Sequence, residues 1–195
     1  GFGDNYIGGG TGNNTVDYSQ VTYLNGVIVK LLSPTAVGLG ETWGESTSNS
    51  GNDRLVNIQN VIGTQYDDTF SGADNTNNSF DGGVGGSDLV DYSYYKSNAI
   101  TVNLDEGWAT GQGTDSFKNI DAIRGTDILA FGDTLIGSST QGNTLYGMAG
   151  NDIIKGMGGK NSLYGGSGND TIYSGKDDDF IDGGTGVDTV SYEEV

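Results

Sequence analysis

Apolar and polar positions recur every nine residues between Gly147 and Tyr192. Each nine begins with a glycine-rich half, carries Asp or Asn at its sixth position and has an aliphatic residue at its eighth. These pairs are Asp152 and Ile154, Asn161 and Leu163, Asp170 and Ile172, Asp179 and Ile181, and Asp188 and Val190. Asn143 and Leu145 keep the same register one nine earlier. The pattern predicts a turn and a short strand in each nine.

The chemistry of the residues explains a step of nine. Glycine adopts left-handed backbone angles that other residues avoid, so the first half can turn the chain and aim carbonyl oxygens at one place. Asp then closes the turn with a hard, charged oxygen of the kind that Ca²⁺ prefers. The last three residues form a strand whose middle side chain points inward. Two nines make one coil, and coils stack about 4.8 Å apart. Each Asp should therefore lie above the Asp eighteen residues away, with room for a cation between them.

These nines resemble the GGxGxDxUx repeat of the RTX (repeats-in-toxin) proteins. A single match would be weak, but six repeats in register are hard to obtain by chance. The resemblance implies an all-β fold, a right-handed parallel β-roll (β-solenoid) of nonapeptide repeats that binds several Ca²⁺ ions. It covers essentially the whole chain, which looks most like the repeat arrays of large RTX adhesins.

Looser copies of the repeat divide the rest of the chain. We expect a short block at 1–19, an insert at 20–62, a second block at 63–93, a second insert at 94–124 and a long block at 125–195. The two inserts are alike, since VIVKLL (27–32) and AITVNL (99–104) both predict a strand followed by a glycine-rich loop, which contains Trp43 or Trp108. The stretch LVNIQNVIG (55–63) fits either a short helix or a flattened solenoid edge. We expect one continuous solenoid, a fragment of a larger protein.

The sixth-position side chains are the candidate metal ligands. Alternate nines lie on opposite sides of the roll, so one column holds Asp133, Asp152, Asp170 and Asp188, and the other holds Asn143, Asn161 and Asp179. The earlier blocks add Asn14, Asp68, Asn78 and Asp88. Neutral Asn offers one carbonyl oxygen, and Lys160 and Lys176 in the second column oppose a cation. We therefore expect tighter Ca²⁺ binding in the first column, and partial occupancy or amide hydrogen bonds in the second.

The resemblance also implies backbone ligands. In RTX repeats these carbonyls come from positions one and three of one turn, and from positions two and four of the turn in the next coil. Carried over to this sequence, the pattern implicates Gly147, Met148, Ala149, Gly150, Gly165, Gly166, Ser167, Gly168, Gly184 and Gly186.

Composition narrows the possible functions. The chain has 26 acidic and 8 basic residues, a net charge of −18, 36 glycines, and neither Cys nor His. Such a charge should hold the metal-free chain open by self-repulsion. The missing residues exclude disulfides, zinc–thiolate sites and His-based catalysis within this chain, so we expect no enzyme activity. Basic residues are too few for nucleic-acid binding, and no apolar run is long enough to insert into a membrane.

The first functional hypothesis is a Ca²⁺-dependent module of a large secreted or surface protein, an adhesin or a toxin. One aliphatic side chain per nine cannot offset the ordering of nine residues, so folding and Ca²⁺ binding should be one event. By resemblance, the chain would leave the cell unfolded by type I secretion and fold outside it or on the bacterial surface, joined to flanking domains. The alternatives are a module that binds a glycan, a host surface or ice, and an accessory repeat of a secreted exoenzyme. The outward Thr and Asn residues are irregular, which disfavours ice.

Overall fold

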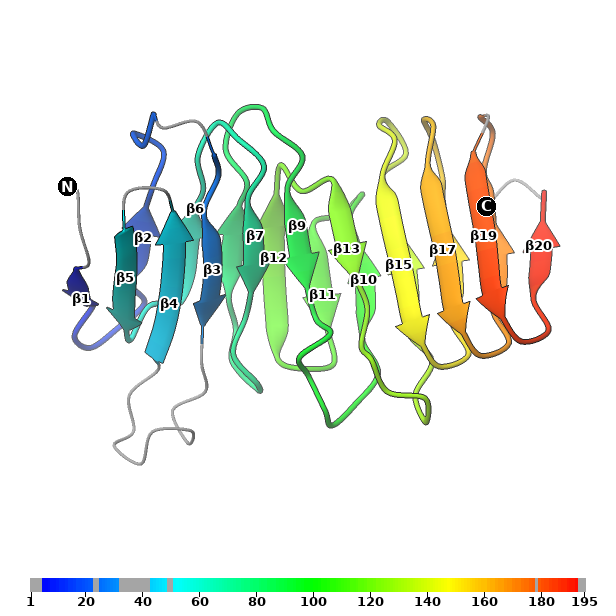
Figure 1. Cartoon of the computed structure of the whole chain (residues 1–195), viewed down its shortest axis with the longest axis horizontal. Coiled ribbons are helices and arrows are strands. Elements are labelled where there is room, and N and C mark those ends of the chain that lie inside the picture. Colours follow the sequence, from blue (N-terminus) through cyan, green and yellow to red (C-terminus); the bar gives the residue numbers. More distant parts are fainter. Residues whose placement is uncertain (1–4, 23–24, 32–42, 49–50, 178, 193–195) are drawn as a thin grey trace. The chain divides into compact units, whose positions relative to one another are not determined.

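The computed structural model describes residues 5–22, 25–31, 43–48, 51–177 and 179–192 (Figure 1). Regular structure in these ranges is entirely β, which confirms the predicted fold class. The strands are β1 (Tyr6–Gly8), β2 (Thr15–Asp17), β3 (Ile28–Leu31), β4 (Trp43–Ser48), β5 (Gly51–Val56), β6 (Asn60–Ile62), β7 (Thr69–Ser71), β8 (Ser79–Asp81), β9 (Leu89–Asp91), β10 (Thr101–Asn103), β11 (Trp108–Thr110), β12 (Thr114–Lys118), β13 (Ala122–Arg124), β14 (Thr134–Ile136), β15 (Thr144–Ala149), β16 (Ile153–Lys155), β17 (Ser162–Ser167), β18 (Thr171–Tyr173), β19 (Phe180–Thr185) and β20 (Thr189–Ser191).

The chain forms two compact units. The first comprises residues 1–90 and 112–120, and the second comprises residues 91–111 and 121–195. In the described part of either unit, no helix is long and apolar enough to cross a membrane.

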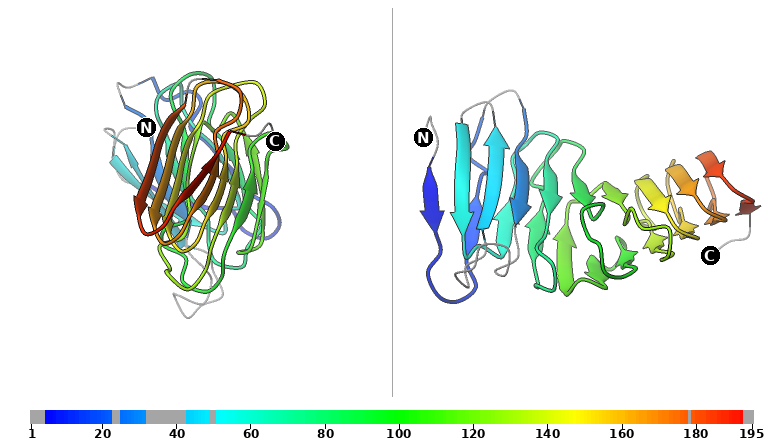
Figure 2. Two further views of the ribbon diagram at one scale, coloured as in Figure 1. Left: turned by 90° about the vertical axis from the view of Figure 1, so that its right-hand side faces the viewer. Right: turned by 60° about the horizontal axis from the view of Figure 1, so that its bottom comes forward.

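The second unit is a parallel β-roll in the predicted register. β13, β15, β17 and β19 pair in parallel in one sheet, and β10, β14, β16, β18 and β20 pair in parallel in the other (Figures 1 and 2). Ile154 faces Ile172, which faces Val190, so partners lie eighteen residues apart. Two nines therefore make one coil. β15, β17 and β19 are six residues long, because they continue through the first three positions of the following turn.

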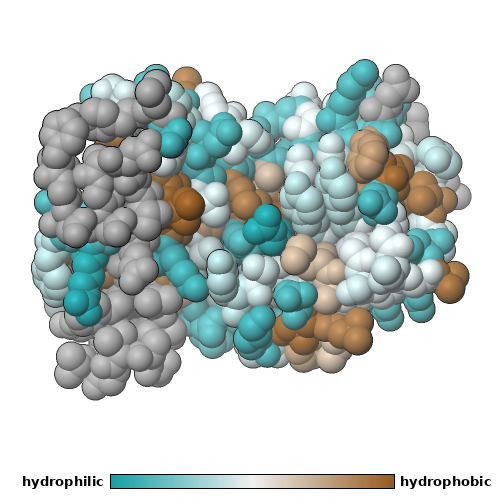
Figure 3. Space-filling model, in the orientation of Figure 1, coloured by the Kyte–Doolittle hydropathy of each residue, from teal (hydrophilic) through white to brown (hydrophobic). Residues whose placement is uncertain are grey.

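Eighth-position side chains form the core of this unit. Leu135, Leu145, Ile154, Leu163 and Ile172 are all fully buried, whereas Val190 in the outermost described coil is 39% exposed. The residues flanking them point outward, as period-two alternation requires. On the face shown in Figure 3, hydrophilic side chains are interspersed with smaller hydrophobic groups. The nonapeptide period thus decides which side chains are buried.

The first unit contains the same architecture with an antiparallel addition. β2, β6, β8 and β12 pair in parallel in one sheet. In the other sheet, β3 and β5 each pair antiparallel with β4, while β1 joins β5 and β7 joins β3 in parallel. The stretch 55–63 is a solenoid edge and not a helix. Leu55 lies near the end of β5, Ile58 is buried at the corner between the strands, and Val61 lies in β6.

The prediction that both tryptophans lie in loops is wrong, because each of them begins a strand. Trp43 begins β4, which pairs antiparallel with β3, although the preceding residues 32–42 lie outside the described part. Trp108 begins β11, which forms an antiparallel hairpin with β10, and Gly107 makes the turn with a φ of 73°. Gly107 therefore marks a hairpin turn, and Ala109 beside Trp108 is buried and pairs with buried Val102.

Candidate metal centre

The sixth-position residues of stacked turns form two hydrogen-bonded columns in the second unit. In one column, the backbone N–H of Asp133 donates to Oδ1 of Asp152 at 2.7 Å, Asp152 donates to Asp170 at 2.8 Å, and Asp170 donates to Asp188 at 3.0 Å. The other column repeats this bond from Asn143 to Asn161 and from Asn161 to Asp179, each at 2.8 Å. The structure thus brings together, in the same two columns, the residues that the nine-residue spacing had grouped. That they bind a metal stays a prediction at this point.

Two carboxylate oxygens in the first column are buried without a donor. Oδ2 of Asp152 and Oδ2 of Asp170 have no hydrogen-bond partner. A buried, unpaired charged oxygen is costly, so a positive group is expected beside each one. A Cβ added to Gly147 would lie 2.4 Å from Oδ2 of Asp152 and 2.5 Å from the carbonyl oxygen of Gly165. A Cβ added to Gly165 would lie 2.3 Å from Oδ2 of Asp170 and 2.4 Å from the carbonyl oxygen of Gly183. Each turn therefore directs a carboxylate oxygen and a backbone carbonyl oxygen toward one place.

Left-handed residues at positions two and four bring the turns this close. The φ angles of Met148, Gly150, Gly166 and Gly168 are 78°, 132°, 110° and 135°. A Cβ on Gly166 would lie 2.1 Å from the carbonyl oxygen of Met148, and one on Gly168 would lie 1.6 Å from that of Gly150. Gly184 and Gly186 repeat both features in the next coil. Glycine is needed at Gly166 and Gly168 because the adjacent backbone leaves no room for a side chain there.

Electrostatics in the first column favour a cation. The pKa of Asp152 is raised to about 7, first by burial and then by the charges of Asp133 and Asp170, and the hydrogen bond from Asp133 opposes this rise. Burial also raises the pKa of Asp170, with a contribution from Asp188. Among the described residues, no three or more His, Cys, Asp or Glu side chains gather into a metal site. Ca²⁺ takes six to eight oxygen ligands, and the carbonyl groups of the turns would add to the aspartate oxygens around a bound ion.

The second column is closed by amide groups at Asn143 and Asn161. Nδ2 of Asn161 donates to the carbonyl oxygen of Gly159 at 3.0 Å and to Oδ1 of Asp179 at 3.1 Å. Nδ2 of Asn143 donates to the carbonyl oxygen of Asp121 at 3.2 Å. These protein donors occupy the side-chain positions where the first column offers negative oxygens.

The candidate ligands of the first unit have protein partners as well. Nδ2 of Asn14 donates to the carbonyl oxygens of Gly12 and Asn57 at 3.1 and 2.9 Å. Oδ1 of Asn78 accepts from the hydroxyl of Thr76 at 2.9 Å. Asp88 accepts from the N–H of Asp68 through Oδ1 at 2.8 Å.

Sequence reasoning missed two threonines that bind candidate ligands. Thr64 donates its N–H to Oδ2 of Asp68, and Thr126 donates its N–H to Oδ2 of Asp133, each at 2.6 Å. The signal available in the sequence was the dipeptide Gly-Thr, which stands at the start of both turns.

Comparison with known proteins agrees with the geometry of the second unit. Segments 129–161, 138–172 and 156–190 match the RTX calcium-binding nonapeptide repeat (four copies). The matched residues include the Asp column from Asp133 to Asp188 and both unpaired Oδ2 atoms. No curated protein matched the chain. Residues 129–190 of the second unit are therefore similar to RTX repeats, which bind Ca²⁺ and are typical of type I-secreted extracellular proteins.

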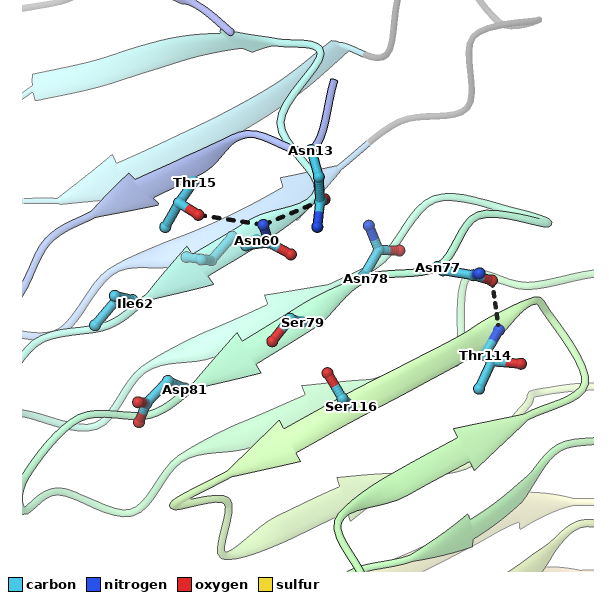
Figure 4. Close-up of a pocket in the computed structure, with 11 residues that line it drawn as sticks. Asn13, Thr15, Asn60, Ile62, Asn77, Asn78, Ser79, Asp81, Thr114 and Ser116 are labelled. Atoms are coloured by element: carbon cyan, nitrogen blue, oxygen red, sulfur yellow. Dashed lines mark hydrogen bonds between the residues drawn. The ribbon is translucent and has the colours of Figure 1, made fainter. Parts of the chain in front are cut away.

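A polar groove lies on the first unit and includes Asn13, Asn77 and Asn78 at the ends of its turns. Its volume is about 750 Å³, and it follows the outer face of β2, β6, β8 and β12 (Figure 4). Thr15, Asn60, Ser79 and Ser116 form a row across these strands in register. Nδ2 of Asn60 donates to Oγ1 of Thr15 at 3.1 Å. The groove therefore presents amides and hydroxyls, together with the carboxylate of Asp81, which pairs with Lys118.

Proposed function

We propose that this chain is a Ca²⁺-dependent folding module of a larger secreted or cell-surface protein, such as an adhesin or a toxin. The observation that carries the proposal is the pair of buried, unpaired Oδ2 atoms of Asp152 and Asp170 between stacked glycine turns. Bound Ca²⁺ would supply the missing positive charge. The residues that would hold it are Asp152 and Asp170, Asp188 in the next coil, and the carbonyl groups of their turns. We propose no catalytic step for this chain.

Coupling between binding and folding follows from where these carboxylates lie. Asp152 and Asp170 are stacked, largely buried and of like charge, so closing the coils without a cation brings repelling charges together. The net charge of −18 adds a general repulsion. Because the site exists only when coils are stacked, the free energy of ion binding contributes directly to folding. Extracellular Ca²⁺, at about a millimolar, lies in the range that weak external sites use.

The test is far-UV circular dichroism of the chain in chelator, in Mg²⁺ and in Ca²⁺. We expect strand signal to increase with Ca²⁺ at millimolar concentration and not with Mg²⁺, because Mg²⁺ demands a small octahedral shell and retains its waters. Equal strand content in chelator and in Ca²⁺ would overturn the proposal.

A second candidate function is binding of a neutral saccharide in the polar groove of the first unit. The row of Thr15, Asn60, Ser79 and Ser116 offers hydroxyl and amide partners suited to sugar hydroxyls. The nearby carboxylate of Asp81 is paired with Lys118 at 2.8 Å. The strong negative charge of the chain opposes anionic ligands.

A glycan array tests this second function. We expect any bound glycan to lose affinity when Asn60 and Ser79 are both changed to Ala. Thr171→Ala, on the outer face of β18 in the second unit, is the matched control and should bind as the parent chain does. Absence of binding in the parent chain, or equal binding by the double variant, would remove this candidate.

A further inference from the structure

Asp133 differs from the next two aspartates of its column. Its Oδ1 accepts from the N–H of Ile100 at 2.8 Å, which continues the column's ladder. Its Oδ2 accepts from the N–H of Thr126 at 2.6 Å and from the Thr126 hydroxyl at 3.1 Å. Both residues are fully buried. The oxygen that is unpaired in Asp152 and Asp170 is thus paired twice within the protein at Asp133.

The first unit contains the same arrangement at Asp68. Its Oδ1 accepts from the N–H of Val27 at 2.6 Å, and its Oδ2 accepts from the N–H of Thr64 at 2.6 Å. The hydroxyl of Thr64 also donates to Oδ1 at 3.0 Å. Thr64 and Asp68 are 1% exposed. We call each Thr–Asp pair a threonine clasp.

The second residue of the turn separates the two kinds of site. In open turns it has positive φ, as in Met148, Gly166 and Gly184. Its amide then points elsewhere: the N–H of Gly184 donates to Oδ1 of Asp182, which precedes the turn, at 3.0 Å. Thr64 and Thr126 are not left-handed, as expected for β-branched residues, which avoid positive φ. Their N–H groups turn inward to the carboxylate instead.

The same inward bond occurs in a turn of the Asn column. Ser138 follows Gly137 and is the second residue of its turn; it lacks positive φ and donates its N–H to Oδ1 of Asn143 at 2.6 Å. This hydrogen bond therefore depends on the backbone conformation of the turn's second residue and not on the charge of the Asp or Asn side chain that accepts it.

We propose that the second residue of each turn decides whether the turn takes up Ca²⁺. A left-handed Gly or Met there leaves the carboxylate open to the ion, whereas Thr64 and Thr126 close it. The clasps place partially positive hydrogens on the oxygens that an ion would need, which both satisfies the carboxylate and repels a cation. Asp68 and Asp133 are then structural residues, held by protein donors alone. This inference rests on the proposed Ca²⁺-dependent function, since it assigns which of the aspartates serve it.

Counting bound ions tests the assignment. Asp133→Asn and Asp170→Asn are matched isosteric variants of one column, and native mass spectrometry of the whole chain in saturating Ca²⁺ gives the number of ions. We expect Asp170→Asn to lose at least one ion and Asp133→Asn to retain the full number. Asp68→Asn, in the other clasp, should also retain it and provides an independent second variant.

Each outcome bears on a separate claim. Loss of an ion in Asp133→Asn or Asp68→Asn would overturn the clasp assignment and leave the proposed function intact. Absence of bound Ca²⁺ in the parent chain would overturn the proposed function itself. Thr126→Val should keep every ion while lowering Tm by a few degrees, because a buried hydrogen bond is lost. Thr126→Ser should restore Tm, and a lost ion in Thr126→Val would contradict the proposal.

Discussion

Gly168→Ala should destabilise the second unit through contact between neighbouring coils. Gly168 has a φ of 135°, and an added Cβ would lie 1.6 Å from the carbonyl oxygen of Gly150. Backbone strain at such an angle costs about 1–3 kcal/mol. Relief of the contact requires the two coils to separate by more than an ångström, which breaks the 2.9 Å bond from the N–H of Gly150 to the carbonyl oxygen of Ser167. The lost bond costs about 0.5–1.5 kcal/mol, so the whole change should cost about 1.5–4.5 kcal/mol.

Hydrogen exchange followed by mass spectrometry in saturating Ca²⁺ measures this loss for each unit separately. Gly10→Ala is the matched control, because Gly10 has a φ of 72° and nothing within 4 Å of an added Cβ. It should show backbone strain alone, about 1 kcal/mol in its own unit. If Gly168→Ala cost no more than Gly10→Ala, the inferred close stacking of the turns would be wrong.

Three further predictions test the core, the buried carboxylates and an ion pair. Ile172→Ala should cost about 2–5 kcal/mol in denaturant unfolding with Ca²⁺, because Ile172 is fully buried, whereas outward Thr171→Ala should stay within about 0.5 kcal/mol. The raised pKa of Asp152, about 7, means that the metal-free folded state binds more protons than the unfolded chain between that value and the ordinary 3.8. The stability of the metal-free folded state should therefore rise as pH falls through this window. Far-UV circular dichroism in chelator should show strand signal increasing as pH falls, and Asp152→Asn should make that signal less dependent on pH. Arg124→Ala should lower Tm by removing the 2.8 Å ion pair to buried Asp91, and Arg124→Lys should recover part of the loss.

The sequence predicted the core and the two columns because both depend only on the nonapeptide period. A step of nine with an aliphatic eighth position is enough to place Ile154 over Ile172, and to stack Asp152 over Asp170. No long-range information is needed, since each coil contacts mainly the next one.

The antiparallel strands could not be predicted in the same way. Trp43 and Trp108 stand in glycine-rich stretches that fit a loop or a hairpin equally well, and the pairing partner decides between them. The threonine clasps were also missed. Asp68 and Asp133 fit the ligand position in sequence, but which groups reach their oxygens depends on the φ angle of the second residue in each turn.

The most direct test of the account is to locate the ions by anomalous scattering from calcium in a crystal grown in saturating Ca²⁺. We predict ions between the stacked turns that hold Asp152, Asp170 and Asp188, with oxygen ligands at about 2.3–2.6 Å. Ions found only beside Asn143 and Asn161, or no ions between the turns at all, would contradict it.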